Sequence, residues 1–154
     1  MKQRPAFNSS GDLPIGIHQA TIAEVLWHFG QHTSQRRIVA RRLERIYKLA
    51  QSTGWLARFI IFGSFVTAKP NPNDVDIFML MEDSFDLSQI TGEAAIIFDH
   101  QAAQSKEGAS VFWIRRLAAI GGEQAALEDW QIKRDKTRRG IVEVISDDSK
   151  QTGA

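Results

Sequence analysis

The residues of this chain best suited to chemistry are a Gly-Ser pair, Gly63-Ser64, and two aspartates that follow it, Asp74 and Asp76. Side chains alternate along a strand, so Asp74 and Asp76 are expected to point to the same face. Two neighbouring carboxylates repel each other unless a cation lies between them. Mg²⁺ prefers oxygen ligands and shares them with the phosphates of a nucleotide. The pattern therefore predicts a Mg²⁺ site at Asp74 and Asp76.

The Gly-Ser pair supplies the second half of such a site. Gly63 lets the backbone approach a phosphate closely, and the N–H groups of a turn and the Ser64 hydroxyl can donate hydrogen bonds to phosphate oxygens. The alternative is ordinary turn and capping chemistry, which also uses Gly, Ser, Asn, Pro and Asp. The two halves stand at a fixed spacing between apolar runs, and together they favour the binding of a nucleoside triphosphate with Mg²⁺.

This combination of residues resembles the signature of a known superfamily. Gly63-Ser64, the intervening residues and Asp74-Val75-Asp76 are similar to the motif of the nucleotidyltransferase superfamily of the DNA polymerase beta type, and of its small, minimal members. The motif covers residues 63–77. Residues 13–18, Leu-Pro-Ile-Gly-Ile-His, resemble a segment of small proteins in an uncharacterised branch. The resemblance implies Asp74 and Asp76 as metal ligands and catalytic residues, and an NTP, preferably ATP, bound at Gly63 and Ser64.

The chain departs from the superfamily pattern at a third carboxylate, which a later strand usually supplies. The matching segment is 109–114, which has no acid, and Ser110 stands at the third-acid position. In the superfamily that acid is thought to act as the base that activates the attacking hydroxyl, and a serine is no base near neutral pH. Asp99 and Glu107 are nearby in the sequence as possible substitutes.

Two functions follow from the resemblance. The first is a Mg²⁺-dependent nucleotidyltransferase that moves a nucleoside monophosphate from an NTP to a hydroxyl of a protein, an RNA or a small molecule. The second is a catalytically degenerate domain that binds a nucleotide or a partner, as in toxin–antitoxin or phage-defence pairs, where small members of the superfamily often occur. The first is preferred because Asp74, Asp76, Gly63 and Ser64 are all present.

Two basic segments allow a different interpretation of what the chain binds. Residues 36–48 carry five arginines and a lysine with Glu44 as the single acid, and they are interpreted as a solvated helix face. The alternative is an anion-binding face for RNA, DNA or a nucleotide. A second cluster lies within residues 133–139 and would reach bound phosphates if this segment folds back toward the aspartates.

The elements that must position these residues alternate between helices and short apolar strands. Helices are expected at residues 18–29, 34–52, 91–106 and 122–130, and strands at 59–62, 77–81, 109–114, from 132 onward and at 140–145. The fold class is therefore α/β or α+β, a mixed sheet with flanking helices. If the strands at 59–62 and 77–81 are antiparallel, Ser64 lies beside Asp74 and Asp76.

Length and composition limit the domain number and the classes of protein to which this chain can belong. A single domain over residues 1–154 is expected, with an extended arm at 1–16 and a frayed tail at 146–154. The chain has no cysteine, which excludes disulfides and thiolate metal sites. The net charge of +1 favours no class of partner. There is no apolar stretch of membrane-spanning length and no apolar signal core, so a cytoplasmic protein without a membrane partner is expected.

Overall fold

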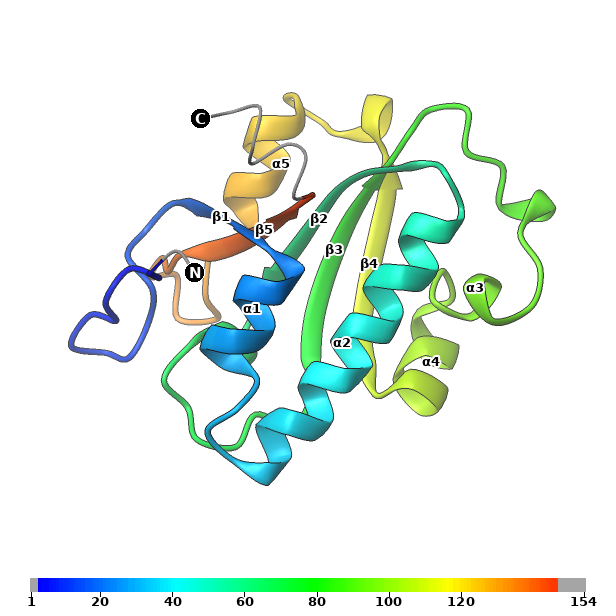
Figure 1. The fold of residues 1–154 in the computed structure, drawn as a ribbon. Helices are drawn as coiled ribbons and strands as arrows, with labels where there is room; N and C mark the ends of the chain where they lie inside the picture. The colour runs from blue at the N-terminus through cyan, green and yellow to red at the C-terminus, as the bar shows by residue number, and fades with distance from the viewer. Residues whose placement is uncertain (1–2, 147–154) are drawn as a thin grey trace.

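A five-stranded mixed sheet forms the centre of the computed structural model, which describes residues 3–146 (Figure 1). The strands are β1 (Ile17–Thr21), β2 (Leu56–Phe62), β3 (Val75–Met81), β4 (Ala109–Arg115) and β5 (Ile141–Ile145), in the spatial order β1-β5-β2-β3-β4. β1 is parallel to β5, and β3 is parallel to β4, whereas β2 is antiparallel to both of its neighbours. The predicted mixed sheet is confirmed. The antiparallel pairing of β2 and β3 meets the condition under which Ser64 was expected to lie beside the aspartates.

The helices lie on both faces of this sheet. They are α1 (Ile22–Phe29), α2 (Ser34–Ser52), α3 (Glu93–Ile96), α4 (His100–Ala102), a π-helical turn η3 (Ala103–Glu107) and α5 (Glu123–Asp129), with 3-10 turns at η1 (Ser64–Val66), η2 (Leu87–Gln89) and η4 (Arg116–Ala118). In Figure 1, α1 and α2 lie in front of the sheet. Leu127 of α5 is buried in a smaller apolar cluster on the opposite face.

The two faces divide the side chains of the central strands between them. Phe59, Ile61, Ile77 and Met79 belong to the larger core under α1 and α2, whereas Ile60, Phe78, Leu80 and Ile141 pack with Leu127. Consecutive residues therefore enter different cores, as the alternation of side chains along a strand requires. This burial on both sides explains why β2 and β3 have uninterrupted apolar sequences.

The predicted helix at 18–29 begins four residues later than expected. Residues 17–21 form β1, because they pair with residues 141–145 of β5. The helix starts after Thr21, whose side chain accepts a hydrogen bond from the backbone N–H of Glu24, while the Glu24 carboxylate accepts one from the N–H of Thr21. This reciprocal capping box fixes the start of α1.

The predicted helix at 91–106 is also wrong as a continuous element. Gly92 has a positive φ of 68°, and α3 ends at Ile96. Asp99 then accepts a hydrogen bond from the N–H of Ala102 and starts α4 as its N-cap. An internal capping residue of this kind replaces a helix with two shorter ones. The expected strand from Ile132 is reduced to a single bridge with Arg138, before β5 begins at Ile141.

Helix α2 agrees with the range expected from the sequence. Thr33 caps it, and Leu43, Ile46, Tyr47 and Ala50 face the core. Val39 is buried, whereas the neighbouring Ile38 is 43% exposed. Within the basic stretch, Arg37 and Arg41 are exposed and Arg45 pairs with Glu107 and Glu93, which agrees with a largely solvated face. Arg36 is the exception and is buried.

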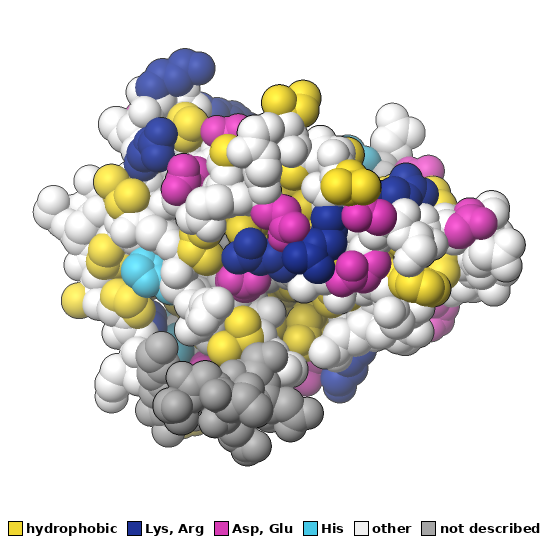
Figure 2. Space-filling view, turned by 90° about the horizontal axis from the view of Figure 1, so that it is seen from above, with side chains coloured by type: hydrophobic (Ala, Val, Ile, Leu, Met, Phe, Trp, Pro, Cys, Tyr) yellow, Lys and Arg dark blue, Asp and Glu magenta, His cyan; other side chains and the backbone are white. Residues whose placement is uncertain are grey.

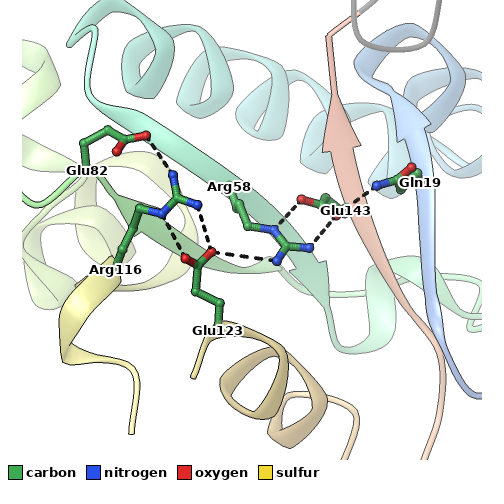
Figure 3. Close-up of polar contacts among 6 residues, drawn as sticks. All are labelled: Gln19, Arg58, Glu82, Arg116, Glu123 and Glu143. Atoms are coloured by element: carbon green, nitrogen blue, oxygen red, sulfur yellow. Dashed lines mark hydrogen bonds and ion pairs between the residues drawn. The ribbon is translucent and has the colours of Figure 1, made fainter. Parts of the chain in front are cut away.

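The end of the molecule seen in Figure 2 carries a band of Lys and Arg side chains flanked by Asp and Glu. The close-up in Figure 3 shows a connected set of polar side chains at the end of the sheet where β3 and β4 finish. Its members, in spatial order, are Glu82, Arg116, Glu123, Arg58, Glu143 and Gln19. Glu123 is the first residue of α5, so this network attaches the start of that helix to the sheet.

The remaining expectations concern the two ends of the chain and the membrane. Residues 3–16, where an extended arm was expected, form an irregular segment with a turn at 9–11, in which Asp12 and Leu13 are buried. Of the tail expected at 146–154, residues 147–154 lie outside the described residues. Within residues 3–146, no helix combines the length and the apolar character that crossing a membrane requires.

Candidate functional site

The register of β2 and β3 brings the Gly-Ser pair against the aspartates. Phe62, the last residue of β2, lies opposite Asp76 of β3. The chain then turns at Gly63, which is buried and has φ 78° and ψ −166°, a conformation that is essentially restricted to glycine. A Cβ atom on Gly63 would overlap Oδ2 of Asp76. The backbone of the turn therefore lies against the Asp76 carboxylate, and Ser64 follows as the first residue of η1.

The parallel register of β3 and β4 places Ser110 beside the same two carboxylates. Ser110 lies opposite Asp76, and its Oγ donates a hydrogen bond of 3.2 Å to Oδ2 of Asp74. All three side chains are half-buried. Asp74, Asp76, Ser110 and the turn at Gly63 and Ser64 thus meet at the edge of the sheet where β3 and β4 begin. The sequence predicted each of these residues, and the structure brings them together.

Asp76 is in an environment that opposes its ionisation. Burial raises its pKa, and the charge of Asp74 raises it further. The charges of Arg139 and Arg134 and the adjacent Ser110 hydroxyl lower it, but the balance leaves the pKa at about 6, against an ordinary value of 3.8. Two carboxylates that share a site oppose each other's ionisation in this way. A bound cation would remove the conflict.

The segment between α5 and β5 brings positive charge to this edge. The charges of Arg134 and Arg139 lower the pKa of Asp76. Figure 1 shows this segment, in orange before β5, at the same end of the sheet as the β2–β3 loop. Arg139 and Lys133 also pair with the buried Asp12, at 3.5 and 3.0 Å. The segment therefore folds back toward the aspartates, which is the condition under which its basic residues could lie near bound phosphates.

Arg36 holds the loop that follows the Gly-Ser turn. Its guanidinium donates hydrogen bonds to the backbone carbonyls of Phe29, Phe65, Thr67 and Lys69. Three of these carbonyls belong to the stretch directly after Ser64, so Arg36 fixes the path of that loop. Burial lowers the pKa of Arg36, although a guanidinium stays charged. In the sequence, Arg36 is one arginine among several in a basic helix, and its type gives no sign of this role.

Both proposed substitutes for the third acid have hydrogen-bond partners other than the site residues. Asp99 is exposed and caps α4. Glu107 is buried, and its Oε2 accepts a hydrogen bond of 2.9 Å from Nε of Arg45. A base must lie within hydrogen-bond reach of the proton it removes, and both carboxylates already have other partners.

The donor set at this edge fits a single Mg²⁺ ion that is completed by a ligand. Residues 3–146 contain no group of three or more His, Cys, Asp or Glu side chains placed to hold a metal. Mg²⁺ does not need such a group, because it binds through one or two carboxylates and fills its other positions with water and phosphate oxygens. Asp74 and Asp76 provide those carboxylates, and the conflict between their charges is what a cation relieves.

The chain matches one protein-family model over residues 5–145, described as a family of unknown function, DUF6932. It belongs to this family. The DUF6932 match includes Gly63, Ser64, Asp74, Asp76 and Ser110, so the whole candidate site lies within the family's own domain. No curated protein and no solved structure matches the chain.

Proposed function

We propose that this DUF6932 protein binds a nucleoside triphosphate with Mg²⁺ at the edge formed by Gly63, Ser64, Asp74 and Asp76, and transfers the nucleoside monophosphate to an acceptor hydroxyl. The observation that carries the proposal is the register of Phe62 with Asp76, because it sets a glycine-dependent turn directly against a carboxylate pair. Phosphate binding by a backbone turn and cation binding by carboxylates would then occur at one place.

Each residue has a role that its chemistry permits. Asp74 and Asp76 would hold the cation, which when bound neutralises phosphate charge and orients the entering and leaving oxygens. Backbone N–H groups after Gly63 and the Ser64 hydroxyl would donate to the terminal phosphates. Arg134 and Arg139 would add positive charge beside the same phosphates, in keeping with their action on the charge of Asp76.

The reaction would form a bond between the acceptor oxygen and the α-phosphorus and break the bond from that phosphorus to the leaving pyrophosphate. The acceptor hydroxyl gives up its proton, and Ser110 is no base for it. A positioned base contributes about 10²–10⁴-fold to such a step. Transfer by this protein is therefore expected to be slow unless the acceptor supplies the base. A protein, an RNA and a small molecule all carry suitable hydroxyls.

A second function is favoured by one specific observation, the serine at the third-acid position. Ser110 donates to Asp74 where a base would otherwise face the acceptor, and Asp99 and Glu107 are engaged elsewhere. In this case the domain binds a nucleotide or a partner without transfer, as in a toxin–antitoxin or phage-defence pair. The two functions share the nucleotide site and differ in the chemistry.

The test separates binding from transfer. Calorimetry with each of ATP, CTP, GTP and UTP, with and without Mg²⁺, measures binding by the wild type and by the double variant Asp74→Ala/Asp76→Ala. Incubation of both proteins with α-labelled nucleotides and host extract measures transfer. Label transfer that the double variant lacks supports the enzyme, and Mg²⁺-dependent binding without transfer supports the second function. A wild type that binds no nucleotide would overturn both.

A further inference from the structure

Three aromatic side chains lie beside the carboxylates on the α5 face of the sheet. Phe62 ends β2, Phe112 belongs to β4, and Trp130 follows the last turn of α5. The ring centroid of Trp130 lies 4.5 Å from that of Phe62 and 5.2 Å from that of Phe112. Phe62 and Phe112 are themselves 6.2 Å apart. We call these three residues the aromatic shelf.

The shelf adjoins the candidate site through the strand register. Phe62 lies opposite Asp76, and Phe112 follows Ser110 by two residues on the same face of β4. Residues two apart on a strand are separated by roughly 6.6 Å. The shelf therefore begins within one or two residue spacings of the carboxylates, on the face to which Asp76 and Ser110 point.

The shelf differs in exposure from the aromatic core beneath it. Phe78 contacts Trp130 at 4.9 Å between ring centroids and is only 3% exposed, as expected of a residue that packs α5 onto the sheet. Phe112 contacts the same tryptophan yet is 38% exposed, and Phe62 and Trp130 are half-buried. The packing of α5 onto the sheet explains why Phe78 is buried. It does not explain why Phe112 is exposed.

The ring of His100 extends the stacked arrangement on the outer side. Its centroid lies 4.8 Å from that of Phe112 with an interplanar angle of 36°, and its Nδ1 is 3.2 Å from the carbonyl oxygen of Val111. Phe112 therefore contacts two neighbouring rings and is still 38% exposed. A ring that is fixed by its neighbours and partly exposed is suited to stacking against another planar ring.

We propose that the aromatic shelf binds the base of the nucleotide whose phosphates occupy the carboxylate edge. The inference rests on the proposed function, because the base is placed by continuity with the phosphate and cation site. A nucleotide joins a polyanion to an aromatic ring, and this surface joins a carboxylate and arginine edge to aromatic rings. Stacking on an aromatic side chain is tolerant of base identity, since every base has a π face.

The test compares a ligand that has a base with one that lacks it. Calorimetry with ATP and with tripolyphosphate, both in Mg²⁺, is carried out on the wild type, Phe112→Leu and Phe112→Tyr. Leucine keeps an apolar side chain and removes the ring, whereas tyrosine keeps the ring. Phe85→Leu is the matched control, because Phe85 is buried in the core on the other face of the sheet. Circular dichroism confirms that each variant is folded.

The expected result is specific to the base. Phe112→Leu should weaken ATP binding about tenfold, the scale of losing one stacking partner, and leave tripolyphosphate binding unchanged. Phe112→Tyr and Phe85→Leu should bind both ligands like the wild type. If Phe112→Leu weakens neither ligand, or both equally, the base site is wrong while the phosphate site stands. If the wild type binds neither ligand with Mg²⁺, the proposed function and the base site are both overturned.

Discussion

Replacing Asp76 with asparagine should make the ligand-free protein more stable near neutral pH. The native pKa of Asp76 is about 6 and its ordinary value is 3.8, so the folded protein binds this proton more tightly than the unfolded chain does. Between these two values the native state holds more protons, and the free energy of unfolding falls as the pH rises. Above about pH 6 the ionised carboxylate destabilises the fold. Asparagine has a similar shape and no charge, so it removes that cost.

The size of the effect follows from the pKa shift. A shift of about two units corresponds to about 3 kcal/mol at a pH well above 6. Asp76 is half-buried, and solvent screens part of its interaction with Asp74. We therefore expect Asp76→Asn to raise the free energy of unfolding by about 1–2 kcal/mol. The gain should shrink as the pH falls below 6, and little of it should remain at pH 4, where the native wild-type carboxyl is protonated.

Urea unfolding of the wild type and of Asp76→Asn, followed over this pH range without divalent ions, measures the difference. Asp129→Asn is the matched control, because it removes one exposed carboxylate at the end of α5. Asp129→Asn should raise the free energy of unfolding by only a few tenths of a kcal/mol, because it removes a negative charge from the C-terminal end of the helix dipole. Mg²⁺ and ATP should then stabilise the wild type and not Asp76→Asn. A variant that is no more stable than the wild type near pH 8, or a difference independent of pH, would refute the reasoning.

Three other changes test the parts of the site separately. Gly63→Ala should lower the free energy of unfolding, measured with urea, by about 2 kcal/mol, because the backbone conformation of residue 63 is nearly restricted to glycine and the new Cβ overlaps Asp76. The same variant should lose MgATP binding, which calorimetry measures. Ser110→Asp should destabilise the ligand-free protein near pH 8 and raise Mg²⁺-dependent transfer in the labelled-nucleotide assay, and robust wild-type transfer that falls in the variant would show that Ser110 marks no lost base. Arg36→Met should lower the free energy of unfolding, measured with urea, by about 3 kcal/mol, because four backbone carbonyls lose their hydrogen-bond donor. Its control is Arg37→Met at an exposed position, which should change the free energy of unfolding by less than about 0.5 kcal/mol.

The sequence predicts that the residues at the centre of the candidate site lie together, because the information needed there is local. Gly63 and Ser64 end one apolar run, and Asp74 and Asp76 begin the next, so a single antiparallel pairing joins them. Ser110 was singled out by the resemblance to the superfamily, which places an acid in a later strand, here at 109–114. Bringing Gly63 and Ser64 to Asp74 and Asp76 needed only the alternation of side chains and the antiparallel pairing of two buried strands.

The parts that the sequence missed depend on contacts between distant residues. The aromatic shelf unites Phe62, Phe112 and Trp130 from three elements, and no spacing relates them. Arg36 is distinguished from its neighbours by the carbonyls that surround it, and these come from the end of α1, from η1 and from the loop after η1. The sequence predicts residues 18–21 of β1 as part of a helix, because the pairing partner that makes them a strand, β5, lies at the other end of the chain.

The pairing of β1 with β5 has a consequence for how the protein is made. Partners such as Gln19 and Glu143 are 124 residues apart in sequence, and β5 lies between β1 and β2 in the sheet. During synthesis, β2, β3 and β4 can pair while β5 is still missing, which leaves the inner edge of β2 open and β1 without its neighbour. Open strand edges invite pairing with other chains, and contacts between distant residues form slowly. A nascent chain of this protein should therefore be most prone to aggregation just before residues 141–145 emerge from the ribosome.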